Sequence, residues 1–291
     1  MKFQTAFKTQ QGKTAVLQYY DLQIEMWNLP HETMNIKTRH GNTFILACGD
    51  KKALPLILLH GGGMNSYMWL EDAAVYSKNF RVYAVDIPGE AGRSDENMLP
   101  LTGPFYTDWL TDVFNELSIE KASVIGISFG AWLSLKFTAC HPERVNKLVL
   151  LSPLGVSPQK KSFLLTLIIS MLTGKSGLDS LYRKINSNPA VSQNVLDYQK
   201  LIGENTNSRN KLMPLLSDEE IRQLNMPVAM FVGEKDIIIH PAKVVRRLKS
   251  LLPNAQITVL PVGHMLIKLA AKIVAFLMAE SSLKNVKGEK G

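Results

Sequence analysis

The stretch VIGISFGAW, Val124–Trp132, places Ser128 between two glycines at the join of a predicted strand and a predicted helix. The residues before it form a short apolar run typical of a buried strand, and those after it have the apolar spacing of a helix. Side chains at Gly126 and Gly130 would obstruct the sharp turn between them. The stretch therefore predicts a strained, exposed Ser128 and a free Phe129 amide at a helix N-terminus, where an anion is stabilised.

As a bare pattern, GxSxG also occurs by chance in glycine-rich turns. The order of further motifs makes it informative: HGGG at His60–Gly63 precedes it, Asp236 follows a later predicted strand, and His264 follows the last one. A nucleophilic serine, an acid and a histidine in this chain order are typical of one class of serine hydrolase. We predict that Ser128, Asp236 and His264 are catalytic.

The acid and the histidine each have competing assignments. Glu234 lies beside Asp236, and this segment alone fits a plain surface turn equally well. His264 follows a glycine that lets the loop carry its imidazole over the sheet edge, whereas His240 comes too early to follow the next strand. The strand before His264 and its position after Asp236 favour the pair Asp236 and His264.

The glycines at 61–63 follow the first parallel strand, at the carboxyl edge where open α/β sheets bind ligands. Amides without neighbouring side chains can approach a substrate oxygen closely. We expect the amide of Gly62, or of Gly63, to form a two-donor oxyanion hole with that of Phe129, while His60 orients the loop. The alternative is a flexible glycine turn without a ligand.

Apolar strands separated by helix-length segments predict an α/β fold with a mostly parallel twisted sheet and helices on both faces. Two further strands alternate around a hairpin turn and are expected as antiparallel N-terminal edge strands. Residues 1–30 read as an arm, partly helical over 17–27. The expected strands are 32–38, 43–48, 55–59, 81–85, 122–125, 145–151, 228–232 and 256–260.

The alternation stops over 154–217, which divides the chain into a core of 1–153 and 218–291 and an inserted helical cap. An apolar helix is expected over 163–172, with breakers at Gly174 and Gly177. We predict that Leu167 and Met171 on this helix contact substrate. Simple packing of the helix on the domain is an equal alternative.

Composition excludes several function classes. The chain has 291 residues, 46% hydrophobic and 20% charged, and a net charge of +8 that is scattered apart from the tail 284–290. Scattered charge argues against nucleic acid, and two distant cysteines without CxxC spacing argue against a disulfide framework or a thiolate metal site. No HxH or HExxH spacing suggests a metal, and we expect no cofactor. The longest apolar run is shorter than the roughly 20 residues of a spanning helix. We expect a cytoplasmic protein with a small-molecule ester as partner, and a homodimer stays open.

Together these motifs resemble the α/β-hydrolase superfamily, and within it the small bacterial carboxylesterases, over essentially the whole chain. The matching pieces are His60–Gly63, Asp86–Gly89, Gly126–Gly130, His141–Val145, Gly233–Asp236 and Gly263–His264. The resemblance implies hydrolysis of carboxylic esters with small to medium, apolar acyl or aromatic groups through an acyl-enzyme. One departure is the loop Asp86–Ser94, which has an extra residue and no histidine.

Other chemistries on the same residues stay open at this point. They are hydrolysis of thioesters, lactones, amides or carbon–carbon bonds, perhydrolysis, and hydroxynitrile cleavage. A non-catalytic binding protein on the same fold is the remaining alternative, because a fold does not fix a function.

Overall fold

The structure is a computed structural model that describes residues 4–188, 190–207, 209 and 212–279, without the side chains of Met171 and Lys175. The basic tail 284–290 lies outside the described residues. Among them, eight strands form one sheet in the order β1-β2-β4-β3-β5-β6-β7-β8. The strands are β1 (His31–Thr38), β2 (Gly41–Cys48), β3 (Leu54–Leu59), β4 (Phe80–Val85), β5 (Ala122–Ile127), β6 (Val145–Leu151), β7 (Val228–Gly233) and β8 (Gln256–Leu260).

The strand directions follow the expected α/β pattern. β1 and β2 form an antiparallel hairpin in which Thr38 pairs with Gly41, and β2 joins the sheet antiparallel to β4. From β4 to β8 every neighbouring pair is parallel. The mostly parallel sheet with antiparallel N-terminal strands is thereby confirmed.

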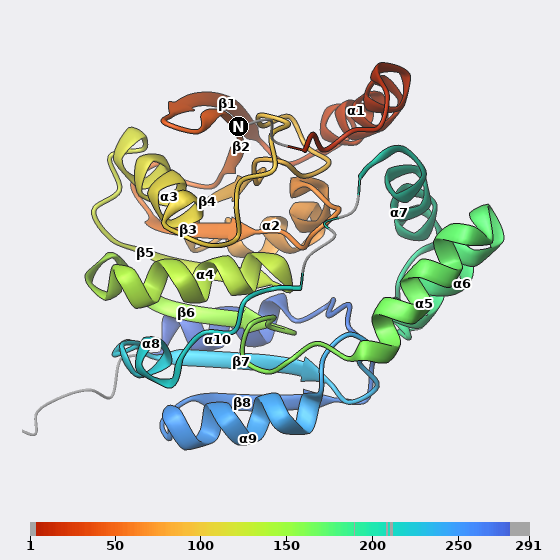
Figure 1. The fold of residues 1–291 in the computed structure, drawn as a ribbon. Helices are drawn as coiled ribbons and strands as arrows, with labels where there is room; N and C mark the ends of the chain where they lie inside the picture. Colours follow the sequence, from red (N-terminus) through yellow and green to blue (C-terminus); the bar gives the residue numbers. More distant parts are fainter. Residues whose placement is uncertain (1–3, 189, 208, 210–211, 280–291) are drawn as a thin grey trace, which may run out of the picture.

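Helices cover both faces of this sheet (Figure 1). They are α1 (Gln10–Glu25), α2 (Leu70–Tyr76), α3 (Phe105–Glu116), α4 (Phe129–Cys140), α5 (Lys161–Leu172), α6 (Gly174–Asn186), α7 (Gln193–Asn205), α8 (Asp218–Arg222), α9 (Pro241–Leu251) and α10 (Ala270–Met278), with short 3-10 turns at Ser66–Trp69 and Pro142–Arg144. None of the described helices is long and apolar enough to cross a membrane.

Alternation along the central strands builds two separate cores. In β3, Ile57 and Leu59 face one cluster, which includes residues of α3, α4 and α9, whereas Leu56 and Leu58 face another, which includes residues of α1, α2 and α10. All four side chains are fully buried. Each buried aliphatic side chain stabilises the fold by about 2 kcal/mol, so both faces hold the sheet rigid beneath the loops at its edge.

The described residues between 154 and 217 contribute α5, α6 and α7 and no strand of the sheet. These helices lie together beyond the carboxyl end of β7, at the edge where the arrow of that strand ends (Figure 1). The prediction that Gly177 breaks a helix was wrong, because it lies inside α6. A Cβ at Gly177 would lie 2.5 Å from the carbonyl oxygen of Ser170, so this glycine lets α5 and α6 approach closely.

Candidate active site

Ser128 occupies the single residue between the end of β5 and the start of α4. Its backbone has φ +54° and ψ −109°, a conformation that strains any residue with a side chain. A Cβ at Gly126 would lie 2.4 Å from the carbonyl oxygen of Gly130, and a Cβ at Gly130 would lie 2.2 Å from that of Leu59. Both glycines are therefore required by close backbone contacts around the predicted turn.

The loops after β7 and β8 bring Asp236 and His264 together. Oδ2 of Asp236 lies 2.6 Å from Nδ1 of His264, and Oδ1 accepts hydrogen bonds from the amides of Ile238 at 2.7 Å and Ile239 at 3.1 Å. Burial alone would raise the pKa of Asp236, but the charge and hydrogen bond of His264 and these two amides lower it overall. Asp236 is thus held as a carboxylate that orients one nitrogen of the imidazole.

The backbone of His264 is fixed from two sides. Its amide donates to the carbonyl oxygen of Ile185 at the end of α6, at 2.8 Å, and its carbonyl oxygen accepts from the Ser152 hydroxyl at 2.9 Å. The other imidazole nitrogen, Nε2, is buried and has no hydrogen-bond partner among the described residues. An unpartnered nitrogen in a buried ring is positioned to accept a proton from a group that enters the adjacent cavity.

Ser128 and His264 line one cavity of about 260 Å³. Gly62 and Phe129 are also on its wall, and Leu167 lines it from α5. Met171, the other residue predicted to contact substrate, has a side chain outside the described part of the structure. The structure therefore brings most of the predicted site residues to one cavity, with Asp236 buried behind His264.

The glycine-rich loop after β3 is held by the fully buried His60. The amide of Ile87 donates to its Nε2 at 2.8 Å, which leaves the proton on Nδ1 for the carbonyl oxygen of Gly61, also at 2.8 Å. Burial lowers the pKa of His60, so the ring is neutral and both nitrogens are engaged. This agrees with the expectation that His60 orients the loop.

The two candidate amides in this loop differ. Gly63 donates its amide to Oε2 of Glu90 at 2.6 Å, whereas no described residue accepts from the amides of Gly62 or Phe129. A Cβ at Gly62 would lie 3.6 Å from Cβ of Phe129, so these two backbone segments are adjacent. Gly62 and Phe129 therefore remain as the free pair of donors, and Gly63 does not.

The chain is similar in sequence to proteins of known family. The family model described as the alpha/beta hydrolase fold matches residues 55–175. Carboxylesterase YbfK of Bacillus subtilis (strain 168) is 31% identical over 262 residues, which cover 86% of this chain and 87% of that protein. The chain is an α/β hydrolase.

Two other comparisons agree with this membership. A second B. subtilis protein, described as an uncharacterized carboxylesterase named nap, is 31% identical over 86% of each chain. The crystal structure of naproxen esterase (carboxylesterase NP) from B. subtilis superposes with a TM-score of 0.83 at 29% identity and covers 93% of this chain and 99% of that one. The similarity to small bacterial carboxylesterases is confirmed.

Two residues of this α/β hydrolase were not predicted as part of the site. Glu90, on the unusual loop after β4, and Arg209, after α7, both line the cavity of Ser128 and His264. They form an ion pair in which Nε of Arg209 lies 2.7 Å from Oε1 of Glu90. Two sequence features could have indicated them: Glu90 is an acid in a loop of unexpected length, and Arg209 is the one charged residue in the polar stretch 205–210. Neither signal shows that residues 119 positions apart meet.

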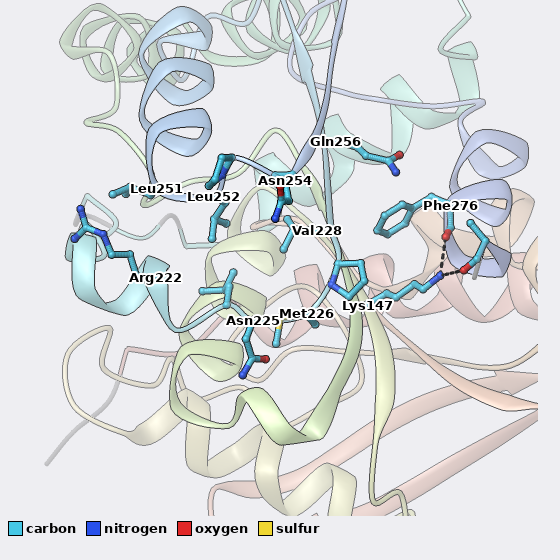
Figure 2. A pocket seen from close by; sticks show the side chains of 15 residues that line it. Lys147, Arg222, Asn225, Met226, Val228, Leu251, Leu252, Asn254, Gln256 and Phe276 are labelled. Carbon is cyan, nitrogen blue, oxygen red and sulfur yellow. Dashed lines mark hydrogen bonds between the residues drawn. The ribbon is translucent and has the colours of Figure 1, made fainter. Parts of the chain in front are cut away.

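A larger cavity, of about 610 Å³, lies at the opposite edge of the α/β-hydrolase sheet, near the amino ends of β7 and β8 (Figure 2). Lys147 reaches past it to donate to the carbonyl oxygens of Phe276 and Leu277, each at 3.0 Å, and to that of Ala279. Its described lining contains no serine, cysteine, histidine or carboxylate. The lysine caps the C-terminal end of α10, and this cavity has no groups for hydrolysis.

Proposed function

We propose that the chain hydrolyses carboxylic esters with small to medium, apolar acyl or aromatic groups, through an acyl-enzyme on Ser128. The observation that carries the proposal is the 2.6 Å contact of Asp236 with His264 beside a cavity that also exposes Ser128. Carboxylesterase relatives that align over most of the chain support an ester as the bond cleaved.

In the first half of the reaction, Nε2 of His264 accepts the proton of the Ser128 hydroxyl as its oxygen attacks the ester carbonyl. The Asp236 carboxylate keeps the proton of the neutral ring on Nδ1 and stabilises the imidazolium that forms. His264 then gives a proton to the leaving alcohol. Ser128 is left esterified, and water repeats the same steps to release the acid.

The carbonyl oxygen becomes negatively charged in each tetrahedral intermediate. The amides of Gly62 and Phe129 are the donors that we assign to it, because both border the cavity and neither is engaged elsewhere among the described residues. In comparable enzymes one such donor lowers the barrier by about 3 kcal/mol. Phe129 is also the first residue of α4, so the helix N-terminus adds to the positive potential.

We assign the residues 154–217 to a cap over this cavity, and the remaining chain to the core. Phe163 and Leu167 of α5 and Leu181 of α6 give the cavity an apolar wall. A space of about 260 Å³ with such a wall fits a short aliphatic chain or one aromatic ring. This supports an apolar acyl group of small to medium size.

The remaining assignments rest on the sequence. We propose that the protein is cytoplasmic. We also propose that it binds no nucleic acid, because its positive charges are scattered outside the tail. We also propose a homodimer, and size-exclusion chromatography with light scattering would test this oligomeric state.

The proposed activity is tested with p-nitrophenyl esters from acetate to laurate. Wild type should hydrolyse the shorter esters, and Ser128→Ala should lose about 10⁴-fold or more of kcat while its thermal unfolding is unchanged. Ser134→Ala is the matched control, because Ser134 lies within α4 and its hydroxyl donates to the carbonyl oxygen of Gly130 at 2.8 Å. A folded Ser128→Ala protein with wild-type turnover would contradict the proposal.

A further inference from the structure

Glu90 places a buried carboxylate beside the glycine-rich loop. The residue is 6% exposed, and its Oε2 accepts the amide of Gly63 at 2.6 Å. A Cβ at the neighbouring Gly62 would lie 3.9 Å from the same oxygen and 3.6 Å from Cβ of Phe129. Glu90 therefore fixes the loop at the residue next to one oxyanion donor, close to the other.

Arg209 reaches the same point from the inserted segment. Its Nε donates to Oε1 of Glu90 at 2.7 Å, and its Nη2 donates to the hydroxyl of Tyr106 at 2.5 Å. The guanidinium carbon lies 4.7 Å from the centre of the Phe129 ring, a cation–π distance. One side chain thus contacts both Glu90 and the residue that bears the second oxyanion donor.

The charges of the pair bear directly on the reaction. An unpaired carboxylate near Gly62 and Phe129 would repel the negative charge that develops on the substrate oxygen, and burial weakens the screening of that repulsion by water. With Arg209 bound to one carboxylate oxygen and the Gly63 amide to the other, the charge is compensated. The arrangement keeps the hydrogen bond that orders the loop without the penalty of a free anion.

We propose that Glu90 and Arg209 are positioning residues for the oxyanion hole. Glu90 orders the loop of Gly62, and Arg209 compensates the charge of Glu90 and packs on the ring of Phe129. The inference rests on the proposed function. It makes stabilisation of the tetrahedral intermediate depend on a residue that the segment 154–217 supplies.

The test compares kcat and KM for p-nitrophenyl butyrate in wild type, Arg209→Met, Arg209→Lys, Glu90→Gln and the double variant Glu90→Gln/Arg209→Met. Arg209→Met removes the cation that compensates the Glu90 carboxylate, and should lower kcat about 10- to 100-fold with KM within about threefold. Arg209→Lys restores a charge and should recover part of the loss. The control Arg183→Met removes an exposed ion pair with Asp179 on α6 and should leave kcat unchanged.

The double variant decides the question. Gln keeps a carbonyl oxygen for the Gly63 amide but removes the charge, so the double variant should be faster than Arg209→Met alone. A side chain that only holds the fold together would make the double variant slower or equal, and that result would overturn the inference. If Arg209→Met does not fold, Glu90→Ala replaces it, because alanine removes the acceptor of the Gly63 amide. A folded Glu90→Ala protein with wild-type kcat overturns the inference equally.

This result is separable from the proposed function. A wild type without Ser128-dependent ester hydrolysis would remove the proposed function itself. An active wild type whose pair variants match it in kcat would remove only the role of Glu90 and Arg209.

Discussion

Nδ1 of His264 lies 2.6 Å from Oδ2 of Asp236, although the two residues come from loops after different strands. The remaining oxygen of Asp236 accepts two backbone amides, so the carboxylate can present only one oxygen to the ring. This geometry fixes the tautomer of the imidazole and leaves Nε2, in a ring that lines the cavity, without a hydrogen-bond partner among the described residues.

Replacing Asp236 by Asn should remove this control. An amide can place its NH₂ group toward Nδ1 and stabilise the wrong tautomer, which then cannot accept the serine proton. We expect kcat to fall by about 10⁴-fold, with KM much less affected. The check is steady-state hydrolysis of p-nitrophenyl acetate, with Glu234→Gln as the neighbouring control. If Glu234→Gln abolishes activity and Asp236→Asn does not, the acid is misassigned.

The turn at Ser128 makes stability sensitive to a single methyl group. In Gly130→Ala the added carbon would lie 2.2 Å from the carbonyl oxygen of Leu59 and 2.5 Å from that of His60, and neither backbone atom can move freely. We expect a loss of about 3 kcal/mol in the free energy of unfolding, measured by urea denaturation. Gly61→Ala is the control, because its methyl group meets no atom closer than 3.8 Å. Equal stabilities would show that the turn at Ser128 is not tightly packed.

Asp72, in the first turn of α2, links stability to pH. Burial, and then the charge of Glu71, raise its pKa to about 6. Because the unfolded chain releases this proton near pH 4, the native state is increasingly disfavoured as pH rises from about 4 to 6, and the penalty is constant above.

Asp72→Asn should therefore increase the free energy of unfolding by about 1–2 kcal/mol at pH 8 and by little at pH 4.5, since the partly exposed carboxyl feels less than the full effect. Urea denaturation at the two pH values measures the difference, and Glu71→Gln on the exposed side is the control. A gain of the same size at both pH values would contradict the account.

Leu167 tests whether α5 borders the acyl group. The helix is apolar on two sides: Phe163 and Leu167 line the cavity, whereas Leu165 is 60% exposed. Leu167→Ala should move the preferred p-nitrophenyl ester to longer chains, and Leu167→Trp to shorter ones. Leu165→Ala on the same helix should leave the preference unchanged. An unshifted optimum in both Leu167 variants would mean that the helix only packs on the domain.

Local patterns were enough to predict the sheet and the turn at Ser128. Strands buried on both faces give apolar runs. The glycines at 126 and 130 predict a tight turn, because a side chain at either position would collide with backbone atoms. The chain order of Ser128, Asp236 and His264 also predicted that they belong to one site; Ser128 and His264 line the same cavity, and Asp236 contacts His264.

Features that depend on contacts between distant segments were not visible. Gly177 reads locally as a helix breaker, but it lies in α6 where α5 comes close. From the sequence the amide of Gly63 is a candidate donor, but in the structure it donates to Glu90, which pairs with Arg209 from 119 residues away. Because α5 has apolar residues on both sides, the sequence also does not show which side of this helix faces the cavity.

The central claim is that Ser128 is acylated during turnover. A p-nitrophenyl ester is mixed with the enzyme, the reaction is quenched in acid within one turnover, and the intact and digested protein is measured by mass spectrometry. We predict a mass increase equal to one acyl group on the peptide that contains Ser128, and no adduct in Ser128→Ala. An acyl group on another residue, or steady hydrolysis by a Ser128→Ala protein, would contradict the account.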